Sequence, residues 1–126
     1  MSVKVYATRW FARWAAKQGL DRVALARAAY EVRSGLYEAD LGGGLLKKRV
    51  ARSGQGKRGG FRALVVTNKK DLWIFVYGFS KNERSSLDST EQEYLKKLAH
   101  HFLSLTAQAL KEAERAGELT EVPCDA

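Results

Sequence analysis

The sequence predicts an α+β fold in which a small, mainly antiparallel sheet carries an N-terminal α-hairpin and a long C-terminal helix. Three observations predict it: two capped helical segments near the start, three consecutive β-like runs in the middle, and a long amphipathic segment at the end. The expected element order is β-α-α-β-β-β-α. Because 126 residues suffice for one hydrophobic core, we expect a single domain over residues 1–126.

The first third of the chain contains a weak strand and the α-hairpin. Residues 3–7 (VKVYA) alternate weakly and predict an edge strand. Thr8 is a suitable N-cap for a helix over residues 9–18 that ends at Gly19, and Asp21 is a suitable N-cap for the helix RVALARAAYEVRSG. The apolar stripes of these helices indicate core positions: Trp10, Trp14, Leu25, Ala29 and Val32.

The middle of the chain predicts three strands. After the glycine-rich loop GLYEADLGGGL come the runs LLKKRVA, FRALVVT and LWIFVYGF. The first run alternates with period two, and the last is apolar almost throughout, as expected for a strand covered on both faces. TNKKD predicts a short hairpin loop between the last two runs, whereas RSGQGKRGG connects the first two.

The last segment predicts one long helix. Thr90 followed by Glu93 has the spacing of a capping box, and Gly117 is a natural residue to end the helix. We expect residues from about 106 onward to form a helical extension. An apolar stripe should pack against the sheet: Leu95, Leu98, Phe102, Leu105 and Ala109.

The charge balance indicates an anionic partner. A formal net charge of +8 is typical of proteins that bind nucleic acid, an anionic membrane surface or an acidic protein. No signal-peptide core and no apolar run of the ~20 residues that a bilayer span requires is present, so we expect a soluble protein without membrane association. The single cysteine, Cys124, is consistent with a cytoplasmic location.

Residues 47–62, KKRVARSGQGKRGGFR, contain seven Lys or Arg, four Gly and no acid. Glycine lets the backbone approach a ligand closely, and the cations neutralise phosphates, so the pattern favours binding of a nucleic-acid backbone. A solvated basic loop is the alternative, but the charges continue into both flanking strands. GQGKRG matches a dinucleotide motif by letters only, because a strand and not a helix follows, and we expect no nucleotide cofactor.

Strand alternation divides these charges between two faces. Lys47 and Arg49 share one face of the first strand, whereas Lys48 and Arg52 point to the other. Arg62 lies just inside the next strand, where it can join one of the two groups.

Two more cations, Lys81 and Arg84, directly follow the third strand. The end of a strand lies at the rim of the sheet, so both side chains can converge with the strand cations. The alternative is a charged turn in which Glu83 neutralises its neighbours.

The residue types exclude several mechanisms. His100 and His101 are adjacent and lack the i, i+4 spacing of a helical metal pair, so we expect no metal. RNA hydrolysis can proceed without metal, because the 2′-OH of the substrate is the nucleophile. Arginine can stabilise the charge on the phosphorane, and a lysine crowded by other cations can act as a base.

The combination LGGGLLKKRVARSGQGKRGGFR, then WIFVYGFSKNER, resembles the RelE/ParE superfamily of bacterial type II toxins, in particular its RelE-like, HigB-related branch. The resemblance implies a metal-independent toxin that cleaves mRNA in the ribosomal A site. It also implies a co-expressed antitoxin with a helix-turn-helix domain, so that DNA is contacted only indirectly, through the antitoxin.

The resemblance also implies roles for individual residues. The family's K-x-K corresponds to Lys47 and Arg49, as candidates for proton abstraction and phosphate contact, and its G-Y-R arginine to Arg62, as the transition-state stabiliser. The family's K-R-E-R corresponds to residues 81–84, with Asn82 in place of the second basic residue. The implied catalytic residues are Lys47, Arg49, Arg62 and Lys81, and the implied RNA-binding residues are Lys48, Arg52, Lys57, Arg58 and Arg84.

One family position has no clear occupant. The tyrosine that follows the last basic motif in RelE itself falls near Asp88, and Tyr77 and Tyr94 are candidate substitutes. Two other functions stay open: a ParE-like inhibitor of DNA gyrase, which would leave mRNA intact, and a non-catalytic RNA-binding module, which would bind RNA without growth arrest.

Overall fold

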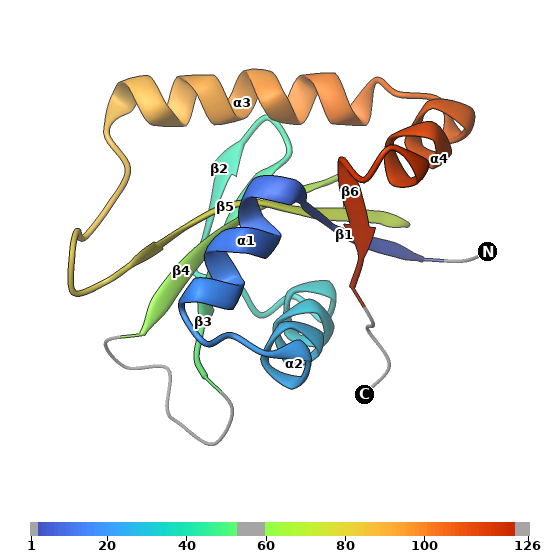
Figure 1. Cartoon of the computed structure of the whole chain (residues 1–126). Helices are drawn as coiled ribbons and strands as arrows, with labels where there is room; N and C mark the ends of the chain where they lie inside the picture. The colour runs from blue at the N-terminus through green and yellow to red at the C-terminus, as the bar shows by residue number, and fades with distance from the viewer. Residues whose placement is uncertain (1–2, 53–59, 123–126) are drawn as a thin grey trace.

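The computed structural model describes residues 3–52 and 60–122 and confirms an α+β fold (Figure 1). A six-stranded sheet in the order β2-β3-β4-β5-β1-β6 is antiparallel throughout, except that β1 and β5 are parallel. The elements are β1 (Lys4–Thr8), α1 (Arg9–Lys17), α2 (Arg22–Arg33), β2 (Ala39–Gly42), β3 (Leu45–Val50), β4 (Phe61–Thr67), β5 (Leu72–Ser80), α3 (Ser89–Leu103), α4 (Ala107–Arg115) and β6 (Leu119–Glu121).

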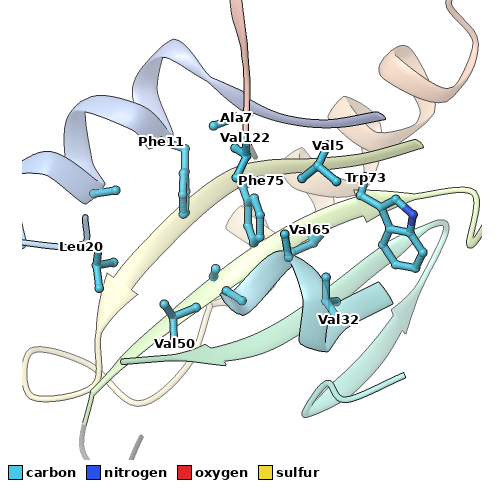
Figure 2. Packing of buried hydrophobic residues seen from close by; sticks show 14 of the residues in the cluster. Val5, Ala7, Phe11, Leu20, Val32, Val50, Val65, Trp73, Phe75 and Val122 are labelled. Atoms are coloured by element: carbon cyan, nitrogen blue, oxygen red, sulfur yellow. The ribbon is translucent and has the colours of Figure 1, made fainter. Parts of the chain in front are cut away.

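Helices cover both faces of the sheet. On one face, α1 and α2 enclose a core that includes Phe11, Val32, Val65 and Phe75 (Figure 2). On the other face, α3 packs over a second core: Leu45, Leu64, Val66, Ile74, Leu95 and Ala99. Strand alternation therefore determines which helix layer each side chain of the sheet faces.

The predicted caps of the α-hairpin are confirmed. The side chain of Thr8 accepts a hydrogen bond from Phe11 N at 3.2 Å, and that of Asp21 accepts one from Ala24 N at 2.9 Å. Each bond satisfies a backbone donor in the first turn that has no partner within the helix. Gly19 follows α1 with a positive φ of 74°, as its expected role at the helix end requires.

The expectation that the first strand lies at the edge of the sheet is wrong. β1 runs parallel to β5 on one side and antiparallel to β6 on the other, so it is an interior strand. The sequence gives no strong indication of β6, since Leu119–Glu121 is only three residues long. Its pairing with a strand more than 100 residues earlier supplies the hydrogen bonds that make it a strand.

The glycine-rich loop contains a strand that the sequence analysis missed. Ala39–Gly42 forms β2, which makes a hairpin with β3. Gly42, Gly43 and Gly44 all have positive φ and form the turn. A Cβ on Gly44 would lie 2.6 Å from Leu103, so the turn also lets the end of α3 approach the sheet.

The predicted long final helix is two helices. Of the two starts that the sequence allows, Ser89 and Thr90, α3 begins at Ser89, but its capping box joins Asp88 to Glu91 instead of Thr90 to Glu93. The helix ends at Leu103, and α4 begins at Ala107 after its own N-cap, Thr106, whose side chain accepts a hydrogen bond from Ala109 N at 3.0 Å. A second local cap thus interrupts the apolar stripe, although Leu95, Leu98 and Phe102 pack on the sheet as expected.

A β-bulge in β5 determines which side chains face the helices. Leu64 pairs with Tyr77 and Val65 with Phe75, so Val76 is the extra residue. Beyond the bulge, Tyr77 faces the α3 layer, whereas Gly78 faces α1, where a Cβ would lie 2.3 Å from the indole of Trp14.

The two tryptophans of α1 differ from the predicted core stripe. Trp14 is partly buried, but 48% of the surface of Trp10 is exposed.

Within the described residues, no helix combines the length and apolarity needed to span a bilayer.

Candidate functional site

Lys47, Arg49 and Arg62 lie on the sheet face that α3 packs against. In the register of β3 and β4, Arg49 lies directly opposite Arg62 and Lys47 opposite the buried Leu64. Lys47 and Arg49 share a face, as strand alternation predicts, and Arg62 lies on the same face. Two arginines directly opposite one another repel, so the arrangement requires a compensating anion.

Glu38, which the sequence analysis missed, provides that anion. Its Oε1 accepts a hydrogen bond from Arg62 Nε at 2.8 Å and lies 3.9 Å from Lys47 Nζ, and its Oε2 lies 3.7 Å from Arg49 Nε. Its backbone N donates to Lys47 O at 2.7 Å, which fixes the residue beside β3. We call Glu38, Lys47, Arg49 and Arg62 the Glu38 cluster.

The Glu38 cluster carries more positive than negative charge. Three cations share one carboxylate, which leaves two positive charges uncompensated within the cluster. The side chain of Arg62 is 4% exposed, whereas 53% of Arg49 and 27% of Glu38 are open to solvent. An anion can therefore approach Arg49 directly and reach Arg62 by taking the place of the Glu38 carboxylate.

Lys48 lies on the opposite face, as alternation predicts, but it is buried. Its ammonium contacts Glu31 of α2 at 2.8 Å, and only 1% of the residue is exposed. The ammonium thus holds α2 against β3, and the role of Lys48 in RNA binding stays a prediction from the sequence.

Arg52 also makes contacts within the protein. Its Nε donates to Gln18 O at 2.8 Å, at the end of α1, and its guanidinium lies 4.9 Å from the ring centroid of Phe61. The side chain is on the exposed surface, so these contacts fix its position without removing it from solvent.

Arg84 belongs to a second group, the Glu91 cluster, made of Glu91, Arg84 and Tyr77. Arg84 forms a bidentate pair with Glu91, with one hydrogen bond of 2.8 Å from Nη1 to Oε2 and a second from Nη2 to Oε1. The Arg84 guanidinium, followed by the backbone N–H of Asp88, lowers the pKa of Glu91 from its ordinary value of 4.5 to about 2. The cluster is thus a neutral ion pair that fixes the start of α3 to the end of β5.

Lys81 lies at the end of the β4–β5 ladder. Its backbone N donates at 2.9 Å to the carbonyl oxygen of Gly60, which directly precedes β4 and lies two residues before Arg62. Within the part of the chain that the structure describes, its ammonium has no ion-pair partner. Lys57 and Arg58, which were expected to bind RNA, lie outside the described residues.

A comparison with protein families identifies the family of the chain. The family model for the RelE toxin of the RelE/RelB toxin–antitoxin system matches residues 3–122. The chain belongs to the RelE toxin family. It is accordingly a toxin of a toxin–antitoxin system, whose partner is an antitoxin. No curated protein matches the chain.

In this RelE-family toxin, Tyr77 lies in the sheet on the same face as Lys47, whereas Tyr94 lies on α3. Tyr77 follows Lys47 and Leu64 in one row across β3, β4 and β5, and its hydroxyl donates to Glu91 Oε2 at 3.4 Å. Burial raises the pKa of its hydroxyl. Tyr94 is 63% exposed on α3 and belongs to neither cluster.

The toxin's described residues contain no group of three or more His, Cys, Asp or Glu side chains that could hold a metal ion. The groups of the Glu38 cluster can act on a phosphate diester: arginine and lysine donate hydrogen bonds to a phosphate, and a carboxylate can accept a proton.

Proposed function

We propose that this RelE-family toxin is a metal-independent endoribonuclease that cleaves mRNA on the ribosome, with the 2′-OH of the substrate as nucleophile. The observation that carries the proposal is the Glu38 cluster, in which Arg62 and Arg49 face each other across two strands beside Lys47 and a single carboxylate. The excess of positive charge attracts the scissile phosphate.

Each member of the cluster has a proposed role. Arg62 stabilises the charge that develops on the phosphorane, since a buried guanidinium interacts more strongly than an exposed one. Arg49 and Lys47 contact the phosphate and orient the 2′-OH, and Lys81 approaches from the end of β5. Because paired arginine and lysine side chains donate hydrogen bonds and do not accept them, Glu38 is the proton acceptor within the cluster, in place of the Lys47 or Arg49 base expected from the sequence.

The proposal is tested by replacing Arg62 with alanine. Arg62→Ala should abolish growth arrest on induced expression and lower the rate of mRNA cleavage by about 10²- to 10³-fold, as expected for loss of a donor to the transition state. Cleavage is measured by mapping new 5′ ends, in cells and in a purified translation system with and without ribosomes. Circular dichroism and antitoxin binding verify that the variant folds.

The matched control is Arg22→Ala, which removes an exposed arginine at the start of α2. This variant should retain full activity. Retained toxicity in Arg62→Ala would remove Arg62 from the mechanism. Growth arrest by the natural protein with intact mRNA would favour a ParE-like gyrase inhibitor, and RNA binding without arrest or cleavage would favour a non-catalytic RNA-binding module.

A further inference from the structure

The outer side of α1 carries a basic and aromatic groove that the proposed chemistry does not use. A shallow cavity of about 370 Å³ is lined by Arg9, Trp10, Arg13, Trp14 and Lys17, which we call the α1 groove. These positions recur along one side of the helix, and none of them is acidic. An anionic ligand with flat apolar parts fits such a surface.

The aromatic part of the groove is a ladder of three rings. Trp14 and Trp10 are nearly parallel, with centroids 6.2 Å apart, and Trp10 stacks on Tyr77 at 4.7 Å. Trp10 nevertheless keeps 48% of its surface exposed. A large exposed indole loses the stabilisation that its burial would provide and is typical of binding surfaces.

Two of the three cations are available to a ligand. Arg9 donates to the carbonyl oxygens of Ala116 and Gly117, both at 3.2 Å, and so holds the end of α4 against α1. Arg13 and Lys17 are exposed, and neither has an ion-pair partner among residues 3–52 and 60–122. The charge of the groove is therefore uncompensated where Arg13 and Lys17 lie.

The α1 groove lies two strands away from the Glu38 cluster. Tyr77, at one end of the ring ladder, pairs with Leu64, and Leu64 pairs with Lys47. α1 packs beside β5, mainly on the face of the sheet opposite α3 (Figure 1). Leu64 is fully buried, so the row gives only the separation of the two sites, about 10 Å for two strand spacings, which a single strand of RNA can span.

We propose that the α1 groove binds the single-stranded RNA that flanks the cleavage site, with a base against Trp10 and phosphates at Arg13 and Lys17. Proteins that bind single strands combine cations along the backbone with aromatic rings for the bases. The half-exposed, stacked indole of Trp10, two strands from the Glu38 cluster, favours RNA over an acidic protein segment as the occupant, because a base can stack on the ring while its phosphates meet the cations. The proposal rests on the proposed function for the identity of the polymer.

The test measures binding without cleavage. Full-length toxin is titrated into fluorescent 2′-O-methyl RNA oligonucleotides of three and ten nucleotides, which lack the nucleophile, and the anisotropy is recorded. Trp10→Ala should weaken binding of the ten-nucleotide RNA by about fivefold or more, as for loss of one stacked base, and change binding of the trinucleotide by less than about twofold. Trp10→Phe should restore most of the affinity.

Two controls separate binding from folding. Tyr30→Ala removes a half-exposed aromatic ring from α2 and should bind both RNAs like the natural protein. The double variant Arg13→Gln/Lys17→Gln removes charge without disturbing the ring ladder. It should weaken binding of the ten-nucleotide RNA and leave binding of the trinucleotide unchanged. Thermal unfolding midpoints verify that each variant is folded.

Several results would overturn the proposal: equal binding of the ten-nucleotide RNA by Trp10→Ala and the natural protein, no advantage of the longer RNA, or an equal loss in Tyr30→Ala. Weakened antitoxin binding by Trp10→Ala with unchanged RNA binding would assign the groove to the protein partner instead. Failure of the proposed nuclease is detected separately, by retained toxicity of Arg62→Ala, because the binding assay involves no cleavage.

Discussion

The Glu38 cluster and the Glu91 cluster each join a carboxylate to arginine on the α3 side of the sheet, yet they differ in charge and burial. Glu38 is shared by three cations, and its closest partner, Arg62, has a side chain that is 4% exposed. Glu91 has one arginine partner, Arg84, whose side chain is 33% exposed. The first cluster has excess positive charge, whereas the second is neutral.

The difference shows that arginines of two basic motifs can differ in how fully their neighbours engage them. Arg84 has both hydrogen-bonding edges engaged by Glu91 and Ser86, and its ring contact with Phe79 is 5.4 Å. It therefore fixes the start of α3. In the Glu38 cluster, one carboxylate cannot satisfy three cations, so capacity for a further anion remains.

The largest difference between the two clusters is expected in their contribution to stability. Glu38→Gln leaves the buried Arg62 opposite Arg49 without an anion and should lower the free energy of unfolding by roughly 2–3 kcal/mol, somewhat less than for loss of a partner in a fully buried pair. Urea unfolding measures it. The matched variant Glu91→Gln should lose less of its free energy of unfolding, because Arg84 is more exposed than Arg62 and glutamine can still take part in a capping box. Equal losses in the two variants would contradict the difference in burial.

The next difference is expected in the salt dependence of RNA binding. Arg49→Gln should reduce the slope of log K against log salt concentration by about 0.7, the value for one phosphate contact to a single strand. Arg84→Gln should leave the slope unchanged, because its guanidinium is occupied by Glu91. Binding of a 2′-O-methyl RNA at a series of salt concentrations measures both, and a reduced slope in Arg84→Gln would place Arg84 at the RNA after all.

The smallest difference is expected in the pH dependence of stability. Because the folded-state pKa of Glu91 is about 2, below its ordinary value of 4.5, the stabilisation from Glu91 is present above about pH 4.5. It is lost as the pH falls from there towards 2. The free energy of unfolding of Arg84→Gln should therefore approach that of the natural protein over this range, as urea unfolding at several pH values can show. A constant gap between the two proteins would exclude this linkage.

Local sequence signals predict much of this fold. The caps at Thr8 and Asp21, the glycine after α1 and the three strands β3 to β5 depend on residues within a few positions of one another, so a single segment contains the information. Alternation likewise places Lys47 and Arg49 on one face, because successive strand residues point to opposite sides.

The tertiary structure alone decides which groups become partners. Glu38 meets Arg62 across 24 positions of the chain, Lys48 meets Glu31 across 17, and β6 becomes a strand only by pairing with β1. Strand alternation specifies the face of a side chain but not the strand or helix packed against that face. The sequence by itself therefore determined a basic, RelE-like α+β chain. The register of the sheet and the packing of α2 decided which cations are buried and paired and which remain open to an anion. These contacts form between segments that are distant in the chain, and the local sequence of one segment does not specify which other segment will pack against it.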